Sequence, residues 1–112
     1  MATNRIKALV LKSVASSAIT GTYAAINPAG AEGPCFMLRI ANLSDTAVTV
    51  SYDGTNDNEV VLSNETLNIS TNSIGVPAGR VALFPIGQKV YVKGSAGTGT
   101  IYLSGYYQPI GE

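Results

Sequence analysis

The sequence predicts an all-β fold, specifically a single-domain antiparallel β-sandwich of the jelly-roll type with about eight short strands across residues 1–112. Three observations lead to this prediction. A chain of 112 residues has the usual size of one domain. Apolar and polar residues alternate with a period of two in several segments that are separated by turn residues. Finally, no segment sustains the apolar i, i+3, i+4, i+7 spacing of an amphipathic helix.

The expected strands are short and closely spaced, as is typical of sandwiches and jelly rolls. The clearest pattern is Val48, Val50 and Tyr52, which alternate with polar residues before the turn dipeptide Asp53-Gly54. The full set of expected strands covers residues 5–14, 35–41, 48–52, 58–63, 67–70, 81–84, 89–93 and 101–107.

The segments between the expected strands are loops by composition. Residues 27–34 contain two prolines and two glycines and are predicted to be a loop. Residues 94–100 contain three glycines and are predicted to be a hairpin connection, because the segment fits no phosphate-binding motif and no helix follows it. Residues 1–5 are a candidate N-terminal arm, and the composition of residues 14–25 favours no element.

The composition limits the possible partners. Only 12% of the residues are charged, about half of the roughly 25% of ordinary globular domains, so neighbouring subunits are expected to cover part of the surface. The net charge is zero and no basic stripe is present, which argues against a nucleic-acid partner. No window approaches the roughly 18 apolar residues of a transmembrane helix, which argues against a membrane partner.

The charges are unevenly distributed along the chain. Residues 1–40 carry four basic residues against one acidic residue (+3), residues 41–70 carry five acidic residues and no basic one (−5), and residues 71–112 carry three basic residues against one acidic residue (+2). Folding could mix these segments. Alternatively, an acidic edge of one copy could meet a basic edge of the next, which would favour a homo-oligomer.

The residue inventory argues against an enzyme and against a cofactor. The chain has no histidine, so the commonest general base and metal ligand is missing. Cys35 lies in an apolar run without an obvious base nearby, and a buried, inert thiol is expected there. The acidic and amide residues of Asp53–Glu59 could bind a calcium ion through their oxygens or could simply form a solvated hairpin loop. No metal is assigned.

The N-terminus only faintly imitates a signal peptide. Arg5 and Lys7 precede four apolar residues, and Lys12 then interrupts the apolar stretch well short of a normal hydrophobic region. We therefore expect a chain that is made in the cytoplasm without cleavage.

Four tyrosines near the C-terminus are candidates for an interface. Tyr91, Tyr102, Tyr106 and Tyr107 could form one surface patch, because a tyrosine can bury its ring and keep its hydroxyl in water. Such a patch would suit a protein partner or a carbohydrate, and ordinary packing on a sandwich face is the alternative. Together with Arg5 and Lys7 of the N-terminal segment, these tyrosines are the predicted interface residues.

Two segments carry a resemblance to a known class of proteins. They are Leu38-Arg39-Ile40-Ala41-Asn42-Leu43-Ser44-Asp45-Thr46-Ala47-Val48-Thr49-Val50-Ser51-Tyr52-Asp53-Gly54 and Lys89-Val90-Tyr91-Val92-Lys93-Gly94-Ser95-Ala96-Gly97-Thr98-Gly99-Thr100-Ile101-Tyr102-Leu103-Ser104-Gly105-Tyr106-Tyr107. In pattern and composition this region, residues 36–108, resembles small structural proteins of tailed-bacteriophage virions, of the head-decoration or tail-accessory kind. The resemblance implies many copies on a symmetric particle and does not extend to the first 35 residues.

The sequence therefore predicts a non-enzymatic phage structural protein located in the virion. The first hypothesis is a capsid decoration (cement) subunit that stabilises the head through contacts with the major capsid protein or neighbouring virion subunits. The alternatives are a tail, baseplate or head–tail accessory subunit, and a carbohydrate-binding module for attachment to the host.

Overall fold

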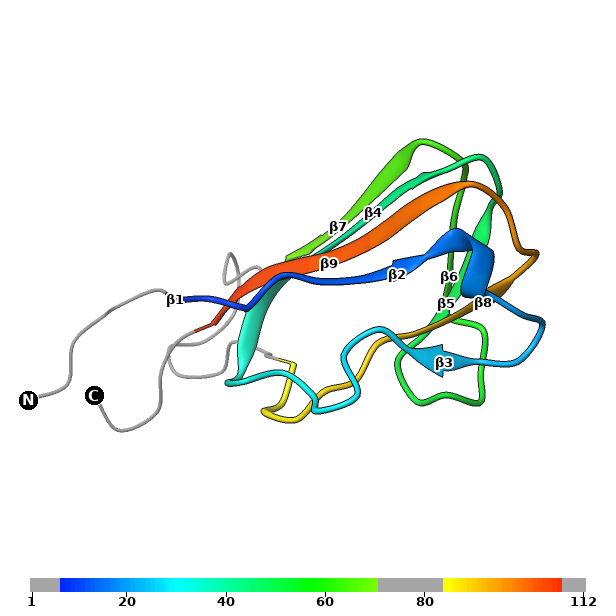
Figure 1. Cartoon of the computed structure of the whole chain (residues 1–112). Coiled ribbons are helices and arrows are strands. Elements are labelled where there is room, and N and C mark those ends of the chain that lie inside the picture. The colour runs from blue at the N-terminus through cyan, green and yellow to red at the C-terminus, as the bar shows by residue number, and fades with distance from the viewer. Residues whose placement is uncertain (1–6, 71–83, 108–112) are drawn as a thin grey trace, which may run out of the picture.

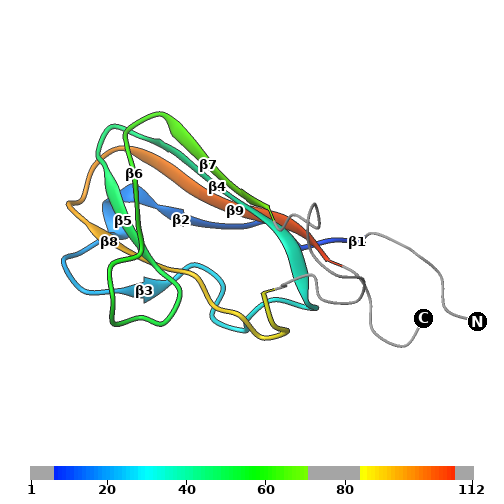
Figure 2. The same ribbon diagram turned by 180° about the vertical axis from the view of Figure 1, so that it is seen from behind.

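The computed structural model describes residues 7–70 and 84–107, and these residues form a sandwich of two antiparallel sheets (Figures 1 and 2). Sheet A has the strand order β1-β9-β4-β7, and β2 also pairs with β9. Sheet B has the order β3-β8-β5-β6. The strands are β1 (Lys7–Ala8), β2 (Lys12–Ala15), β3 (Ala24–Ala25), β4 (Cys35–Ser44), β5 (Val48–Ser51), β6 (Glu59–Val61), β7 (Glu65–Ser70), β8 (Tyr91–Gly94) and β9 (Gly99–Tyr107), with a 3₁₀ turn η1 at Ser16–Ala18.

The strand order is that of a jelly roll, so the predicted fold class is confirmed. Strands β1 and β2 both pair with β9 and act as one interrupted strand, which gives eight strands in two four-stranded layers within the described part of the chain. The first of these eight pairs with the last, the second with the seventh, the third with the sixth and the fourth with the fifth. This nested pairing is the double Greek key of a jelly roll.

A one-residue bulge separates β1 from β2. Opposite β9, Lys7 pairs with Tyr107 and Ala8 with Tyr106, whereas Lys12 pairs with Leu103. Five residues on one strand therefore span four on the other, which is the definition of a bulge. The extra residue leaves both Val10 and Leu11 about 60% exposed.

Most expected strands are present, two details differ, and one expected strand lies mostly outside the described residues. The segment 94–100 is not a hairpin, because β8 lies in sheet B and β9 in sheet A, so the chain crosses between the sheets there. Strand β3 was not predicted, since two alanines carry no alternating pattern. Of the expected strand at 81–84, only Phe84 lies within the described residues, and it forms an isolated bridge with Cys35.

The predicted loop at 27–34 lies between β3 and β4 and packs firmly against the segment that leads into β8. The side chain of Asn27, which is buried, donates from Nδ2 to the carbonyl of Gln88 at 3.0 Å and accepts from the N–H of Val90 at 2.8 Å. The N–H of Ala31 also donates to the carbonyl of Gln88, at 2.9 Å. These bonds fix the position of the loop at the end of the sandwich.

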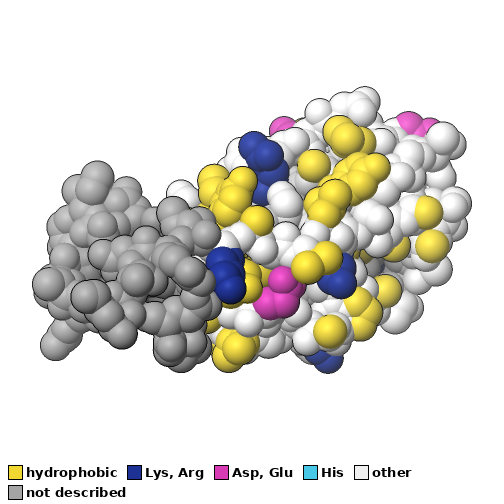
Figure 3. Space-filling model, turned by 60° about the vertical axis from the view of Figure 1, so that its left-hand side comes forward, with side chains coloured by type: hydrophobic (Ala, Val, Ile, Leu, Met, Phe, Trp, Pro, Cys, Tyr) yellow, Lys and Arg dark blue, Asp and Glu magenta, His cyan; other side chains and the backbone are white. Residues whose placement is uncertain are grey.

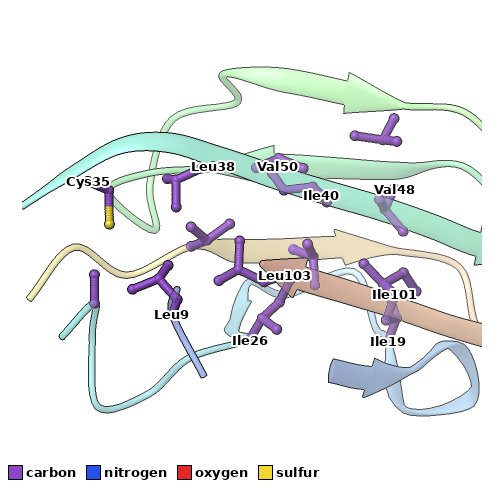
Figure 4. Packing of buried hydrophobic residues seen from close by; sticks show 14 residues of the cluster. Leu9, Ile19, Ile26, Cys35, Leu38, Ile40, Val48, Val50, Ile101 and Leu103 are labelled. Carbon is purple, nitrogen blue, oxygen red and sulfur yellow. The ribbon is translucent and has the colours of Figure 1, made fainter. Parts of the chain in front are cut away.

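The hydrophobic core lies between the two sheets (Figure 4). Sheet A contributes alternate residues of its central strands, including Leu38, Ile40, Ile101 and Leu103, all at most 1% exposed. Sheet B contributes Val48, Val50, Val61, Val90 and Val92 from the opposite side. This alternation also determines which residues of each strand face outward.

A buried polar side chain joins the two sheets at one end of this core. Asn42 of β4 is 0% exposed, and its Nδ2 lies 2.8 Å from the carbonyl oxygen of Thr46 and 3.1 Å from those of Val61 and Leu62. Its Oδ1 accepts from the N–H and the hydroxyl of Ser44. The Asn42 amide thereby ties β4 of sheet A to the ends of β5 and β6 in sheet B.

Replacing Asn42 with alanine should lower the free energy of unfolding by about 3 kcal/mol, because buried carbonyls would lose their donor and a small cavity would form. Chemical denaturation with urea measures the effect. Thr66→Ala, on the exposed side of β7, is the matched control and should change stability by less than about 0.5 kcal/mol. Equal losses in the two variants would contradict the assigned role of Asn42.

Candidate functional site

The outer face of sheet B is partly covered by the protein's own β5–β6 loop. This loop, residues 52–58, folds back over β8, and Gly54 lies directly against the ring of Tyr91, where an added Cβ would approach the ring to 3.2 Å. Gly54 also has φ +78°, a conformation that favours glycine. Ser51 lies beneath the loop and is 0% exposed, although it is at an outward position of β5.

Three side chains hold the β5–β6 loop on sheet B. The ammonium of Lys93 lies 3.0 Å from Oδ1 of Asp57 and 4.6 Å from the centre of the Tyr23 ring. The hydroxyl of Tyr23 donates to the same carboxylate oxygen. Burial and the neighbouring Asp57 raise the pKa of Tyr23 to about 12, so this hydroxyl stays protonated and remains a donor at neutral pH.

The acidic start of this loop is organised by its own hydrogen bonds. Oδ1 of Asp53 accepts from the N–H groups of Thr55 and Asn56 and from the hydroxyl of Ser51, each at 2.8 Å, and Oδ2 accepts from Nδ2 of Asn56. Four donors therefore occupy the oxygens that a calcium ion would need. Within residues 7–70 and 84–107, no group of three His, Cys, Asp or Glu side chains is placed to hold a metal.

The outer face of sheet A is the open counterpart, and we call it face A. It is built from the residues of β4 and β9 that alternate with the buried ones. The members are Met37, Arg39, Ala41, Leu43, Thr100, Tyr102, Ser104 and Tyr106. Leu43 is 53% exposed and Tyr106 is 45% exposed. Arg39 is the one charged residue among the eight, so face A combines exposed apolar groups with little charge.

A hollow of about 190 Å³ lies on face A and is lined by Met37, Arg39, Ser104, Gly105 and Tyr106. Met37 lies directly opposite Tyr106 on the neighbouring strand, and Arg39 lies opposite Ser104. The hollow forms because the small side chain of Ser104 lies among the three larger ones. Nε of Arg39 donates to Oδ1 of Asn68 on β7 at 3.1 Å, which fixes the guanidinium at the rim. Figure 3 shows hydrophobic side chains gathered on the surface of the molecule, with a few charged groups between them.

The structure separates the four predicted interface tyrosines. Tyr102 and Tyr106 both lie on face A. Tyr107 is on the opposite side of β9, where it packs against the core and its ring approaches Gly33. Tyr91 belongs to β8 in sheet B, beneath the β5–β6 loop. The expectation of one continuous patch is therefore corrected to two tyrosines on face A and two elsewhere, because alternate residues of a strand face opposite sides.

Of the two predicted basic interface residues, Lys7 lies in β1 beside Tyr107, and Arg5 lies outside the described residues. Sequence reasoning missed Met37, Arg39 and Ser104 as surface residues. The alternation of Met37 and Arg39 with Leu38 and Ile40 could have identified these outward positions. The pattern is hard to recognise because residues 35–38 are all apolar.

Cys35 is buried, and its thiol donates to the carbonyl of Gly33 at 3.3 Å. Burial, assisted by the nearby Glu32 carboxylate, raises the pKa of the Cys35 thiol to about 11. The reactive thiolate is therefore scarce at neutral pH.

The described residues also contain no helix long and apolar enough to span a membrane.

Comparison with known proteins assigns no family. No protein-family model matches the chain, and no curated protein matches it. One solved structure, from work on Bacillus endospore appendages described as a novel family of disulfide-linked pili, is similar over 96% of this chain and 91% of its own at 16% identity, with a TM-score of 0.45. At this level of similarity the match carries no conclusion about function, and the fold assignment depends on the strand pairing alone.

The hydrogen bonds of the β5–β6 loop predict a specific response to acid. The N–H groups of Asn56 and Thr55 hold the pKa of Asp53 below its ordinary value of 3.8, and Tyr23 and Lys93 lower the pKa of Asp57. A carboxylate with a depressed pKa contributes stability above its unfolded pKa and loses that contribution as the pH falls below about 4.

Asp53→Asn should keep the acceptor at position Oδ1 but remove the titration. Its melting temperature should therefore fall less steeply between pH 5 and pH 2 than that of the wild type, as followed by circular dichroism. Thr66→Ala, which removes no carboxylate, is the control and should keep the wild-type slope. A wild-type slope in Asp53→Asn would show that Asp53 does not hold the loop.

Proposed function

We propose that this chain is a non-catalytic structural subunit of a multi-copy particle and that it attaches through face A. One observation carries the proposal. The protein covers part of the outer face of sheet B, around Tyr91 and Lys93, with its own loop, whereas face A has no such cover among the described residues and carries exposed apolar and aromatic groups with a single charge. Aromatic and methionine side chains are enriched at the centres of protein interfaces, where charged residues are depleted.

For the particle, we propose a tailed-bacteriophage virion. The resemblance of residues 36–108 to small phage structural proteins supports this choice, as does the low charge of the chain. Within the virion, the first choice is a capsid decoration subunit that binds the major capsid protein. A tail, baseplate or head–tail accessory subunit is the alternative. Close to one copy per major capsid protein in purified particles would favour the head, and a few per cent would favour the tail.

The chemistry of the described residues is consistent with a structural role. The thiol of Cys35 is buried and protonated, and the carboxylates of Asp53 and Asp57 are engaged in fixing a loop. A decoration subunit needs a stable fold and a repeated contact. The buried Asn42 network and the long β4–β9 pairing supply the first, and face A supplies the second.

A second candidate function is carbohydrate binding, which the hollow on face A favours. Sugar rings pack against aromatic side chains while their hydroxyls take hydrogen bonds from polar groups. Tyr106 offers such a ring, and Arg39 and Ser104 offer hydrogen-bonding groups beside it. The hollow is small, about 190 Å³, so this candidate would act as a weak attachment module that gains strength from many copies.

Tyr106→Glu tests both candidates. Purified protein is added to particles that lack it, and the bound fraction is measured by co-sedimentation. The variant should bind about 30-fold more weakly, since an aromatic hot spot contributes about 2 kcal/mol or more. The control is Val60→Glu, which introduces the same charge at a 60% exposed position on the outer face of sheet B and should bind normally.

The outcomes separate the two functions. Loss of particle binding in Tyr106→Glu, without glycan binding by the wild type on an array, supports the structural subunit. Glycan binding by the wild type that disappears in Tyr106→Glu supports the carbohydrate module instead. If Tyr106→Glu binds particles as well as Val60→Glu does, the assignment of face A is wrong.

A further inference from the structure

Strand β7 forms one edge of sheet A. It has six residues, Glu65–Ser70, and it pairs with β4 without a break in register from Met37↔Ser70 to Asn42↔Glu65. In both ribbon views it is the outermost strand of its sheet, and no described segment lies beside it on the side away from β4 (Figures 1 and 2). Its sequence contains no proline, lysine or arginine, the residues that commonly block pairing at an edge.

The other sheet edges in the described part of the chain are protected. Opposite β7 in sheet A, the bulge between β1 and β2 interrupts the edge, and the Glu32 carboxylate accepts the N–H of Val10 there at 3.1 Å. In sheet B, the edge strands β3 and β6 have only two and three residues. Short, bulged or charged edges resist pairing with another chain. Strand β7 has six residues and no bulge, and its one charged residue, Glu65, lies at its end, so it is the edge suited to accept a further strand.

The side chains of β7 are self-complementary. Thr66, Asn68 and Ser70 are exposed on the outer side, and Leu67 and Ile69 are half-buried on the core side. An antiparallel second β7 that pairs Asn68 with its own copy places Leu67 opposite Ile69 and Thr66 opposite Ser70. In this register polar residues meet polar residues on one face, and aliphatic residues meet aliphatic residues on the other.

We propose that β7 pairs with β7 of a second copy about a two-fold axis at Asn68, which joins two copies of sheet A into one continuous sheet. A two-fold interface requires a surface that is complementary to itself, and the register described above satisfies this condition. The inference concerns a contact between two copies of this chain, so it stands whether or not the chain is found on a particle.

The chemistry at the axis favours a second copy as the occupant. A side-chain amide is both donor and acceptor, so two facing Asn68 side chains can each donate from Nδ2 to Oδ1 of the other. Arg39 already donates to Oδ1 of Asn68 at 3.1 Å, which holds the amide in place. A row of polar groups, Ser104–Arg39–Asn68, would then continue across the axis into the same row of the partner.

The charges also permit this pairing. Glu65 is the single charged residue of β7, and it lies at the end of the strand. In the antiparallel register, the two copies of Glu65 are separated along the strands by about 20 Å, beyond the roughly 8–10 Å over which exposed charges interact in physiological salt. Pairing therefore does not bring the acidic groups of β7 together.

One strand pair buries less than the roughly 1,600 Å² of a standard interface, so we expect a weak dimer of isolated protein. Sedimentation velocity at protein concentrations from about 10 μM to about 1 mM should show a monomer that converts to a dimer with rising concentration. A wild type that stays monomeric throughout this range would overturn the proposal.

Opposite charges at the axis test the register. Asn68→Lys and Asn68→Asp should each remain monomeric, because each places like charges opposite one another, whereas an equal mixture of the two should dimerise at least as tightly as the wild type. Ser13→Lys, at an exposed position on the other edge of sheet A, is the matched control and should dimerise normally.

The remaining outcomes would contradict the proposal. Failure of the mixture to dimerise would overturn pairing about Asn68, and loss of dimer in Ser13→Lys alone would place the contact at the β2 edge. Melting curves of every variant, followed by circular dichroism, should match the wild type within a few degrees. This control separates a lost contact from a lost fold, since surface substitutions usually change stability by less than about 0.5 kcal/mol.

Discussion

The amide of Asn42 is the constraint on which the arrangement of the two sheets depends. It is buried, and it donates toward the carbonyl groups of Thr46, Val61 and Leu62 at 2.8–3.1 Å. These carbonyls lie where the chain passes between the sheets, since Thr46 precedes β5, Val61 ends β6 and Leu62 follows it. A buried carbonyl without a donor costs about 1–3 kcal/mol. The Asn42 side chain therefore allows the β4–β5 and β6–β7 connections to lie close together at one end of the core.

With the sheets fixed in this way, the two outer faces differ in how much of their surface the protein itself covers. The β5–β6 loop covers part of sheet B and is held there by Tyr23, Asp57 and Lys93. Face A has no corresponding cover among the described residues, and its exposed side chains include Leu43 and Tyr106. The loop therefore covers part of the outer face of sheet B, whereas the side chains of face A remain exposed. Sheet A also ends in a regular edge strand, β7.

Much of the fold could be predicted from the sequence. The alternation of Val48, Val50 and Tyr52 and of the residues in β9 follows directly from burial of one face of each strand. The crossing between β8 and β9 could not be predicted, because a glycine-rich segment permits either a hairpin or a passage between sheets. Strand β3 has only two alanines, and its position depends on pairing with Val92 and Tyr91, which is a tertiary effect.

The candidate site was predicted less completely than the fold. Tyr102 and Tyr106 were correctly placed on one face, since they are four positions apart on the same strand and an even offset keeps two side chains on the same side. Tyr107 was wrongly added, although its odd offset from Tyr106 places it on the opposite face. Arg39 and Met37 could be recognised only once β4 was paired with β9, because the hollow is formed by cross-strand neighbours that are more than 60 residues apart in the sequence.

The most direct test of this account compares solvent access to the two faces in the free protein and on the particle. Hydroxyl-radical footprinting with mass spectrometry reports the oxidation of individual methionine and tyrosine side chains. The account predicts that Met37, Tyr102 and Tyr106 become protected on the particle, while Tyr23 and Tyr91 on sheet B keep the reactivity of the free protein. Protection of Tyr23 and Tyr91 with unchanged reactivity of Met37 and Tyr106 would contradict the account.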